Sequence, residues 1–256
     1  MCGCRRYFVH GERYLDSTVQ GGCPCPSPSP YVVRMITSIC LHAMGSFFLS
    51  FIVKLEASCR VSIIMPINFD LEKIRQAHEC DNYFETGLWD PRDEVSSKLA
   101  LTCNFKRVYC IEIREDWVEL GLSVFADEIK NGRYKLILDD SINMKKYICE
   151  LECGVDNPRT IFFLDAHVDN SNIKNYSKRC PLFDELEAIA SLNRKDHVIL
   201  IDDLRIIKSA FPWGECSYGN IDFLEQIKRK ILSINPLYKF MTLNGHIEND
   251  VLYAYV

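Results

Sequence analysis

The fold is decided by two apolar runs that end in charged residues, Ile161-Phe-Phe-Leu-Asp165-Ala-His167 and His197-Val-Ile-Leu-Ile-Asp202-Asp203. Continuous apolar runs of this length are typical of strands that are buried on both faces of a parallel sheet. The acidic residues would then lie at the carboxyl ends of the strands, the edge where open α/β sheets bind ligands. Three aspartates and a histidine would therefore converge on one site, suited to a hard cation and to proton transfer.

The rest of the chain from residue 68 onward alternates in the same way. Strands are predicted at 82–87, 107–113, 134–139, 160–165 and 197–202, and helices at 70–80, 94–103, 115–130, 141–152, 181–192 and 220–233. Helices of this length between strands indicate right-handed crossovers and a parallel sheet. The last two predicted strands, 238–243 and 251–256, are joined by only seven residues, which favours a hairpin. The sequence thus predicts a Rossmann-like, doubly wound α/β fold, with a mostly parallel seven-stranded sheet and an antiparallel C-terminal hairpin strand.

Composition limits the function classes that need to be considered. The chain has 256 residues, 48% of them hydrophobic and 25% charged, which is typical of a globular protein with one large domain and an appendage. A net charge of -5 argues against a broad basic face, so we expect no nucleic-acid partner. The cysteines number thirteen, an odd count without zinc-site spacing in the apolar segments, which favours a reducing compartment.

Residues 1–60 are expected to form a disordered tail rich in cysteine and proline, together with an apolar segment at 35–53. A membrane tether through 35–53 is an alternative that we do not favour, because serine, threonine, histidine and glycine dilute the segment. A misplaced translation start is another, since Met65 precedes the first regular element and opens the expected domain, 65–256. A glycosylation sequon at Asn175 near the predicted site favours the cytoplasm, because a lumenal enzyme would risk a glycan there.

Three further strand ends carry residues suited to a ligand. Glu85-Thr86-Gly87 allows a tight turn and a close approach of backbone amides to a polar group, although a single glycine also fits an ordinary turn. Glu112 could accept both hydroxyls of a ribose, or be a solvated glutamate. In Asp139-Asp140-Ser141 a side chain could reach an adenine edge or cap the next helix.

With Cys180-Pro-Leu-Phe-Asp-Glu-Leu186 and the terminal hairpin, these motifs resemble class I S-adenosylmethionine-dependent methyltransferases. The similarity is strongest to metal-dependent sugar O-methyltransferases of the macrocin type and covers residues 68–256. One departure is the loop Gly87-Leu-Trp-Asp-Pro-Arg-Asp93, which has a single glycine where the family has a glycine-rich loop.

The resemblance implies a role for each strand end. Glu85, Thr86 and Gly87 would lie by the methionine part of S-adenosylmethionine, Glu112 would hold its ribose, and Asp140 with Ser141 would flank its adenine. The metal ligands would be Asp165, Asp202 and Asp203, binding Mg²⁺ or Mn²⁺. His167 would be the general base, and we assign Asp165 to the catalytic pair and to the cofactor site as well.

These roles predict transfer of a methyl group to a hydroxyl of a sugar or glycan. Such a hydroxyl is a poor nucleophile until a cation lowers its pKa and a base takes its proton. Other readings stay open: a catechol or small-phenol acceptor, a cofactor-binding or interaction module without catalysis, and a nicotinamide-dependent enzyme. The last is disfavoured by the absence of GxGxxG and by the hairpin. The oligomeric state is not predicted.

Overall fold

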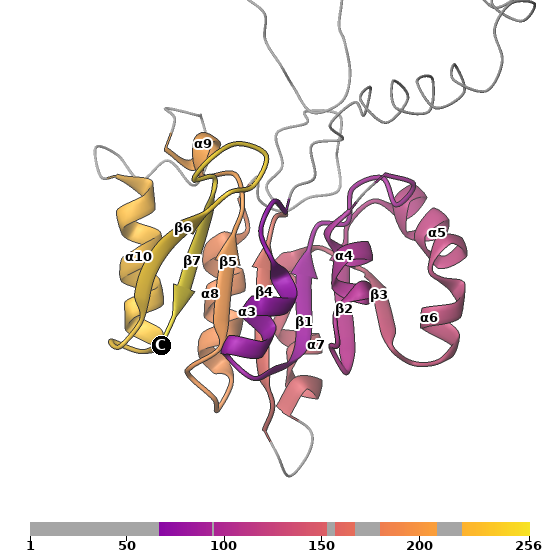
Figure 1. The fold of residues 1–256 in the computed structure, drawn as a ribbon, viewed down its shortest axis with the longest axis horizontal. Coiled ribbons are helices and arrows are strands. Elements are labelled where there is room, and N and C mark those ends of the chain that lie inside the picture. The colour runs from indigo at the N-terminus through magenta and orange to yellow at the C-terminus, as the bar shows by residue number, and fades with distance from the viewer. Residues whose placement is uncertain (1–66, 94, 153–156, 167–179, 209–221) are drawn as a thin grey trace, which may run out of the picture. The chain divides into compact units, whose positions relative to one another are not determined.

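The molecule is built on one seven-stranded sheet with helices on both faces, as a computed structural model shows (Figure 1). The structure describes residues 67–93, 95–152, 157–166, 180–208 and 222–256, which lie in one compact unit, Ile64–Val256. The strands are β1 (Cys80–Thr86), β2 (Arg107–Glu112), β3 (Tyr134–Leu138), β4 (Arg159–Leu164), β5 (Val198–Ile201), β6 (Lys239–Leu243) and β7 (Val251–Tyr255). Their order in the sheet is β3-β2-β1-β4-β5-β7-β6.

The sheet confirms the predicted fold class. Strands β1 to β5 pair in parallel, and β7 lies antiparallel between β5 and β6. Strands β4 and β5 are buried apart from the first residue of β4, and they are apolar from Ile161 and Val198 onward, as expected for strands that are covered on both faces. The C-terminal hairpin therefore completes the sheet beside β5 (Figure 1).

Helices cover the two faces as separate groups, each with its own apolar core. One core lies between the sheet and α3 to α6, and the other between the sheet and α7 to α10. The helices are α3 (Leu71–Ala77), α4 (Ser96–Thr102), α5 (Glu115–Val124), α6 (Ala126–Lys130), α7 (Lys145–Ile148), α8 (Leu182–Ser191), α9 (Leu204–Ile207) and α10 (Phe223–Ile234). Alternate residues of β1 enter the two cores, with Tyr83 on one side and Phe84 on the other.

The structure differs from the predicted helices in three places. The helix predicted at 115–130 is divided at Phe125 into α5 and α6, and the one predicted at 141–152 consists of α7 between two 3₁₀ turns, η1 (Ser141–Asn143) and η2 (Cys149–Glu152). Helix α9 was not predicted, because four residues are too short to show a helical repeat.

The predictions for residues 1–60, including the apolar segment 35–53, lie outside the described residues. Within the described ranges, no helix has the length and apolar character needed to cross a bilayer.

Candidate functional site

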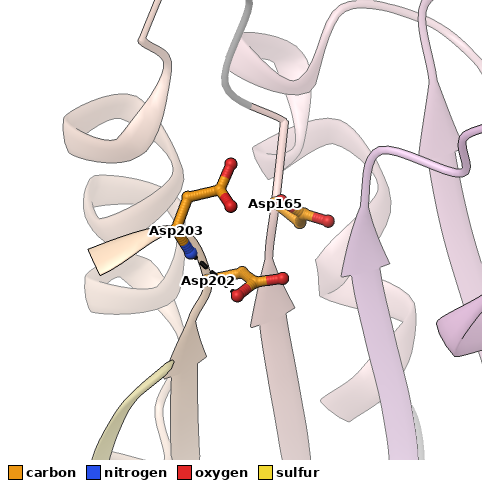
Figure 2. A group of neighbouring side chains, drawn as sticks. All are labelled: Asp165, Asp202 and Asp203. Carbon is orange, nitrogen blue, oxygen red and sulfur yellow. Dashed lines mark hydrogen bonds between the residues drawn. The ribbon is translucent and has the colours of Figure 1, made fainter. Parts of the chain in front are cut away.

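Three aspartates gather at the ends of β4 and β5, as the sequence predicts. Carboxylate oxygens of Asp165, Asp202 and Asp203 all lie within 4.8 Å of one another (Figure 2). Asp202 and Asp203 are buried, whereas Asp165 is half-buried. Hard oxygen ligands in this number suit Mg²⁺ or Mn²⁺, so the predicted metal ligands fit such an ion.

The backbone positions these carboxylates by hydrogen bonds beyond the strand ends. The Asp165 N–H donates to the Thr86 carbonyl (3.1 Å), and the Asp202 N–H donates to the Leu164 carbonyl (3.2 Å). Asp203 has a left-handed backbone (φ +62°), and its N–H donates to the Asp202 carboxylate (2.8 Å; Figure 2). A left-handed aspartate costs roughly 1 kcal/mol, and strain of this kind clusters at functional sites. The sharp turn sends two consecutive carboxylates to the same edge.

A partly buried ion-pair network holds one side of the acidic group. The Arg205 guanidinium lies 2.6 Å from a carboxylate oxygen of Asp203 and also pairs with Asp250, which is fully buried directly before β7. Asp250 also accepts hydrogen bonds from the backbone of α9, from the Arg205 N–H to its carboxylate (2.9 Å) and from the Leu204 N–H to its carbonyl (2.8 Å). The sequence analysis missed Asp250, because nothing in the local pattern shows that β7 lies next to β5.

Burial and mutual repulsion oppose ionisation of the acidic group. Burial and the neighbouring carboxylates raise the pKa of Asp165 well above its ordinary value, and the same two causes raise the pKa of Asp202 to about 8. Arg205 opposes both shifts. A bound divalent cation would favour the charged forms, so the electrostatics agree with the metal assignment.

Gly87 is needed for the contact between the ends of β1 and β4. Its φ is +86°, and a Cβ atom there would lie 2.7 Å from the Asp165 carbonyl oxygen. The Gly87 N–H donates to the Ile111 carbonyl (2.8 Å). The single glycine of this loop thus lets the chain pass directly against Asp165, a constraint within the protein that the sequence did not reveal.

Glu85 is fully buried on the α4 side of the sheet. Its carboxylate accepts hydrogen bonds from the hydroxyls of Ser96 (2.7 Å) and Ser97, at the start of α4. Burial raises its pKa to about 7. The structure therefore places Glu85 at the predicted strand end with its oxygens bonded to α4, and its role beside the methionine part of a cofactor stays a prediction. The sequence analysis did not single out the two serines.

Glu112, the predicted ribose ligand, is also buried and bonded to the protein. It accepts hydrogen bonds from the N–H groups of Leu88 and Arg114, each at 2.7 Å. The first of these bonds fixes the loop after Gly87, where Trp89 has a left-handed backbone (φ +63°) and its ring lies 5.0 Å from that of Trp117. Glu112 is thus at the edge that the sequence predicts, with backbone donors on both oxygens.

Three polar residues follow β3, and their side chains make different contacts. Asp140 is the N-cap of η1 and accepts a hydrogen bond from the Ile142 N–H (3.1 Å), whereas Asp139 accepts from Asn143 and Tyr147. The capping role considered for this motif therefore belongs to Asp140. The hydroxyl of buried Ser141 has no hydrogen-bond partner among the described residues.

The predicted general base, His167, lies outside the described residues, which end at Ala166 in this part of the chain. Its catalytic role stays a prediction. The sequence analysis also gave no site role to Glu185, a fully buried glutamate of α8 whose nearest polar neighbours include Thr86 and Ser141. The spacing of Leu182, Glu185, Leu186 and Ile189 was the available signal, because it places Glu185 on the buried face of the helix.

Comparison with known proteins yields similar structures only. No protein-family model matches the chain, and no curated protein does. One similar structure is the O-methyltransferase from Bacillus cereus in complex with SAH, with 17% identity and a TM-score of 0.47 over 88% of this chain and 97% of that chain. Another is the O-methyltransferase TomG from Streptomyces achromogenes, involved in tomaymycin synthesis, in complex with SAM, with 12% identity and a TM-score of 0.47 over 88% and 96% of the two chains. Similarities this distant do not assign the chain to a family or an activity.

Proposed function

We propose that the chain is an S-adenosylmethionine-dependent methyltransferase. More specifically, we propose an O-methyltransferase that acts on a hydroxyl of a sugar or glycan with the help of a divalent cation. The observation that carries this proposal is the group formed by Asp165, Asp202 and Asp203 at the edge of the sheet where ligands bind, directly beside the turn at Gly87. Its supporting context is the resemblance of the strand-end motifs to metal-dependent sugar O-methyltransferases.

The cofactor half of the site is formed by the earlier strands. Thr86, Glu112 and Ser141 are buried at the ends of β1 and β2 and directly after β3, which is the order that the family resemblance implies for the methionine, ribose and adenine parts. The antiparallel β7 distinguishes this sheet from the all-parallel dinucleotide-binding fold and disfavours a nicotinamide cofactor. S-adenosylmethionine supplies an activated methyl group when bound, so the protein has only to orient the two reactants and move a proton.

The acceptor half of the site is formed by β4 and β5. Asp165, Asp202 and Asp203 would hold Mg²⁺ or Mn²⁺, which lowers the pKa of a coordinated hydroxyl and fixes its position. Arg205 and Asp250 hold Asp203 in place, and the Gly87 turn fixes the Asp165 backbone. His167, two residues after Asp165, would accept the hydroxyl proton, since an imidazole accepts protons near neutral pH.

The decisive experiment is a titration with cofactor and metal. Methyl transfer to a panel of glycans and of catechols should depend on Mg²⁺ or Mn²⁺ and should be lost in the Asp165→Ala, Asp203→Ala double variant. Retained metal-dependent turnover in that variant would contradict the metal role, and transfer only to catechols would replace the glycan acceptor by a phenol. His167→Ala should lower turnover far more than it weakens cofactor binding.

One observation favours a rival proposal, in which the chain is a cofactor-binding or interaction module without catalysis. The two oxygens of Glu112 already accept backbone N–H groups, one of them from the loop that lacks the family's glycines. Calorimetry with S-adenosylmethionine separates the two proposals, because a module that has lost its cofactor half would not bind it.

We also propose that the protein works in the cytoplasm and binds no nucleic acid. The odd cysteine count supports a reducing compartment, and Cys80, Cys103 and Cys110 are buried thiols in apolar surroundings. The net charge of -5 supports the absence of a nucleic-acid partner. Localisation of a tagged full-length chain tests the first proposal, and a membrane position would favour a tether through residues 35–53.

A further inference from the structure

Glu185 is a buried carboxylate on the inner face of α8. Its side chain is fully buried in the first turn of α8, and neither carboxylate oxygen has a hydrogen-bond partner among the described residues. The hydroxyls of Ser141 and Thr86 lie near enough to favour its charged form, but neither makes a hydrogen bond with it. Within the part of the chain that the structure describes, the hydrogen-bonding capacity of the Glu185 carboxylate is therefore unused.

The surroundings of Glu185 are polar and negatively charged. Thr86 ends β1, Ser141 begins η1, and the Ser141 hydroxyl has no hydrogen-bond partner in the described ranges. Asp140 and Asp184 add negative potential that raises the pKa of Glu185, after the larger effect of burial. A ligand group that pairs with the Glu185 carboxylate must supply positive charge and N–H or O–H donors.

A purely structural role does not account for Glu185. The buried face of α8 is otherwise apolar, with Leu182, Leu186, Ala188 and Ile189 in the same core. A buried carboxylate without a partner is strongly unfavourable, and a leucine at this position would continue the apolar stripe. The free-energy cost is explained if a ligand pairs with the carboxylate.

We infer that Glu185 binds the α-ammonium group of S-adenosylmethionine, next to Thr86. This inference rests on the proposed function, because it assumes that the earlier strand ends hold this cofactor. The ammonium group carries three N–H donors and a positive charge, which together satisfy both oxygens of a carboxylate. The sulfonium carries positive charge but has no hydrogen-bond donor, and the adenine amino group has donors but no charge. Neither group therefore provides both the charge and the donors that the Glu185 carboxylate needs.

Calorimetry with three ligands tests the inference on the full chain. S-adenosylmethionine and S-adenosylhomocysteine both carry the ammonium group, whereas 5′-methylthioadenosine carries the same nucleoside without the amino-acid part. Glu185→Gln should weaken the first two by about 10- to 100-fold, the usual range for loss of a charged hydrogen bond, and leave the third unchanged. Glu187→Gln is the matched control, because Glu187 lies on the same helix, is exposed and pairs with Lys230. It should bind all three ligands like the wild type.

Other patterns overturn the inference in distinguishable ways. Equal weakening of all three ligands would show a structural role or an adenine contact, and weakening of S-adenosylmethionine alone would show a sulfonium contact. Unchanged binding in Glu185→Gln, with a wild type that binds, would remove Glu185 from the site and leave the proposed function standing. A wild type that binds none of the three would overturn both. Should Glu185→Gln not fold, Glu185→Asp takes its place with the same expected pattern, because it withdraws the oxygens by one methylene.

Discussion

The carboxylates at the ends of β1 and β2 differ from those at the ends of β4 and β5 in what surrounds their oxygens. Glu85 and Glu112 accept hydrogen bonds from serine hydroxyls and backbone N–H groups, so they hold α4 and the adjoining loop in place. The three aspartates have carboxylate oxygens within 4.8 Å of one another, and Arg205 pairs with one of them, Asp203. An acidic strand end can therefore stabilise a loop or provide charge for a ligand, and the nearby donors distinguish the two uses.

The largest expected effect comes from Gly87, where the two regions meet. Gly87→Ala combines a left-handed backbone with a Cβ atom 2.7 Å from the Asp165 carbonyl oxygen. We expect the free energy of unfolding to fall by about 3 to 4 kcal/mol, from backbone strain and overpacking together. Denaturant unfolding measures this loss.

Gly132→Ala is the matched control for Gly87. Gly132 also has a left-handed backbone (φ +77°), but a Cβ atom there would meet nothing within 4 Å. Its loss should be about 1 kcal/mol, the strain alone. Equal decreases in the free energy of unfolding at the two glycines would show that the close approach to Asp165 does not add to the cost of the substitution.

The next effect is the pH dependence that Glu85 gives to stability. Its pKa is raised from 4.5 in the unfolded chain to about 7 in the fold. The folded protein keeps a proton that the unfolded chain has released, so this contribution is complete below pH 4.5 and is lost as the pH rises through about 7. Between pH 5 and 8 it amounts to roughly 2 to 3 kcal/mol. Glu85→Gln should remove that part of the pH dependence in denaturant unfolding, and an unchanged slope would contradict the assignment.

Asp202→Asn tests the acidic group at the ends of β4 and β5, and it replaces a carboxylate by an amide of the same size. The amide oxygen can still accept the Asp203 N–H, but one ligand charge is lost. Mn²⁺ affinity should fall by about 100-fold, or ~2.7 kcal/mol, whereas the metal-free protein in chelator should gain on the order of 1 kcal/mol from reduced repulsion. Asp139→Asn at the end of β3 is the control and should leave Mn²⁺ affinity unchanged. A loss of stability in chelator would show that the aspartates are satisfied within the protein.

The smallest effect is expected at Glu112. Glu112→Gln replaces one acceptor by an N–H₂ group that faces a backbone N–H, either of Leu88 or of Arg114. We expect a loss of about 1 to 2 kcal/mol in the free energy of unfolding, the cost of one unsatisfied buried donor. An increase in stability would place Glu112 with the aspartates as a carboxylate that awaits a ligand.

The sequence predicted the strand ends well because the signal is local. A run of apolar residues that stops at Asp165 or Asp202 shows both that the strand is buried and where it ends. Parallel pairing then brings those ends to one edge without further information. The acidic group was therefore predictable before its geometry was known.

The partners of these residues were not predictable in the same way. Asp250 reaches Arg205 only because β7 pairs with β5, and that pairing is set by the whole sheet. The bonds from Ser96 and Ser97 to Glu85 depend on the path of the loop between β1 and α4. Glu185 did show its burial through helical spacing, but spacing says nothing about which groups lie opposite a buried residue.

The position of β7 has a consequence for biosynthesis. Strands β1 to β5 can pair as they emerge from the ribosome, since domains fold from the N-terminus during synthesis. Strand β6 is made before β7 but has no partner until β7 lies between it and β5. The salt bridge from Asp250 to Arg205 must wait for the same event. The contacts of the two strand-end glutamates can therefore form before β7 is made, whereas the ion pair that holds Arg205 beside the acidic group forms only with that strand.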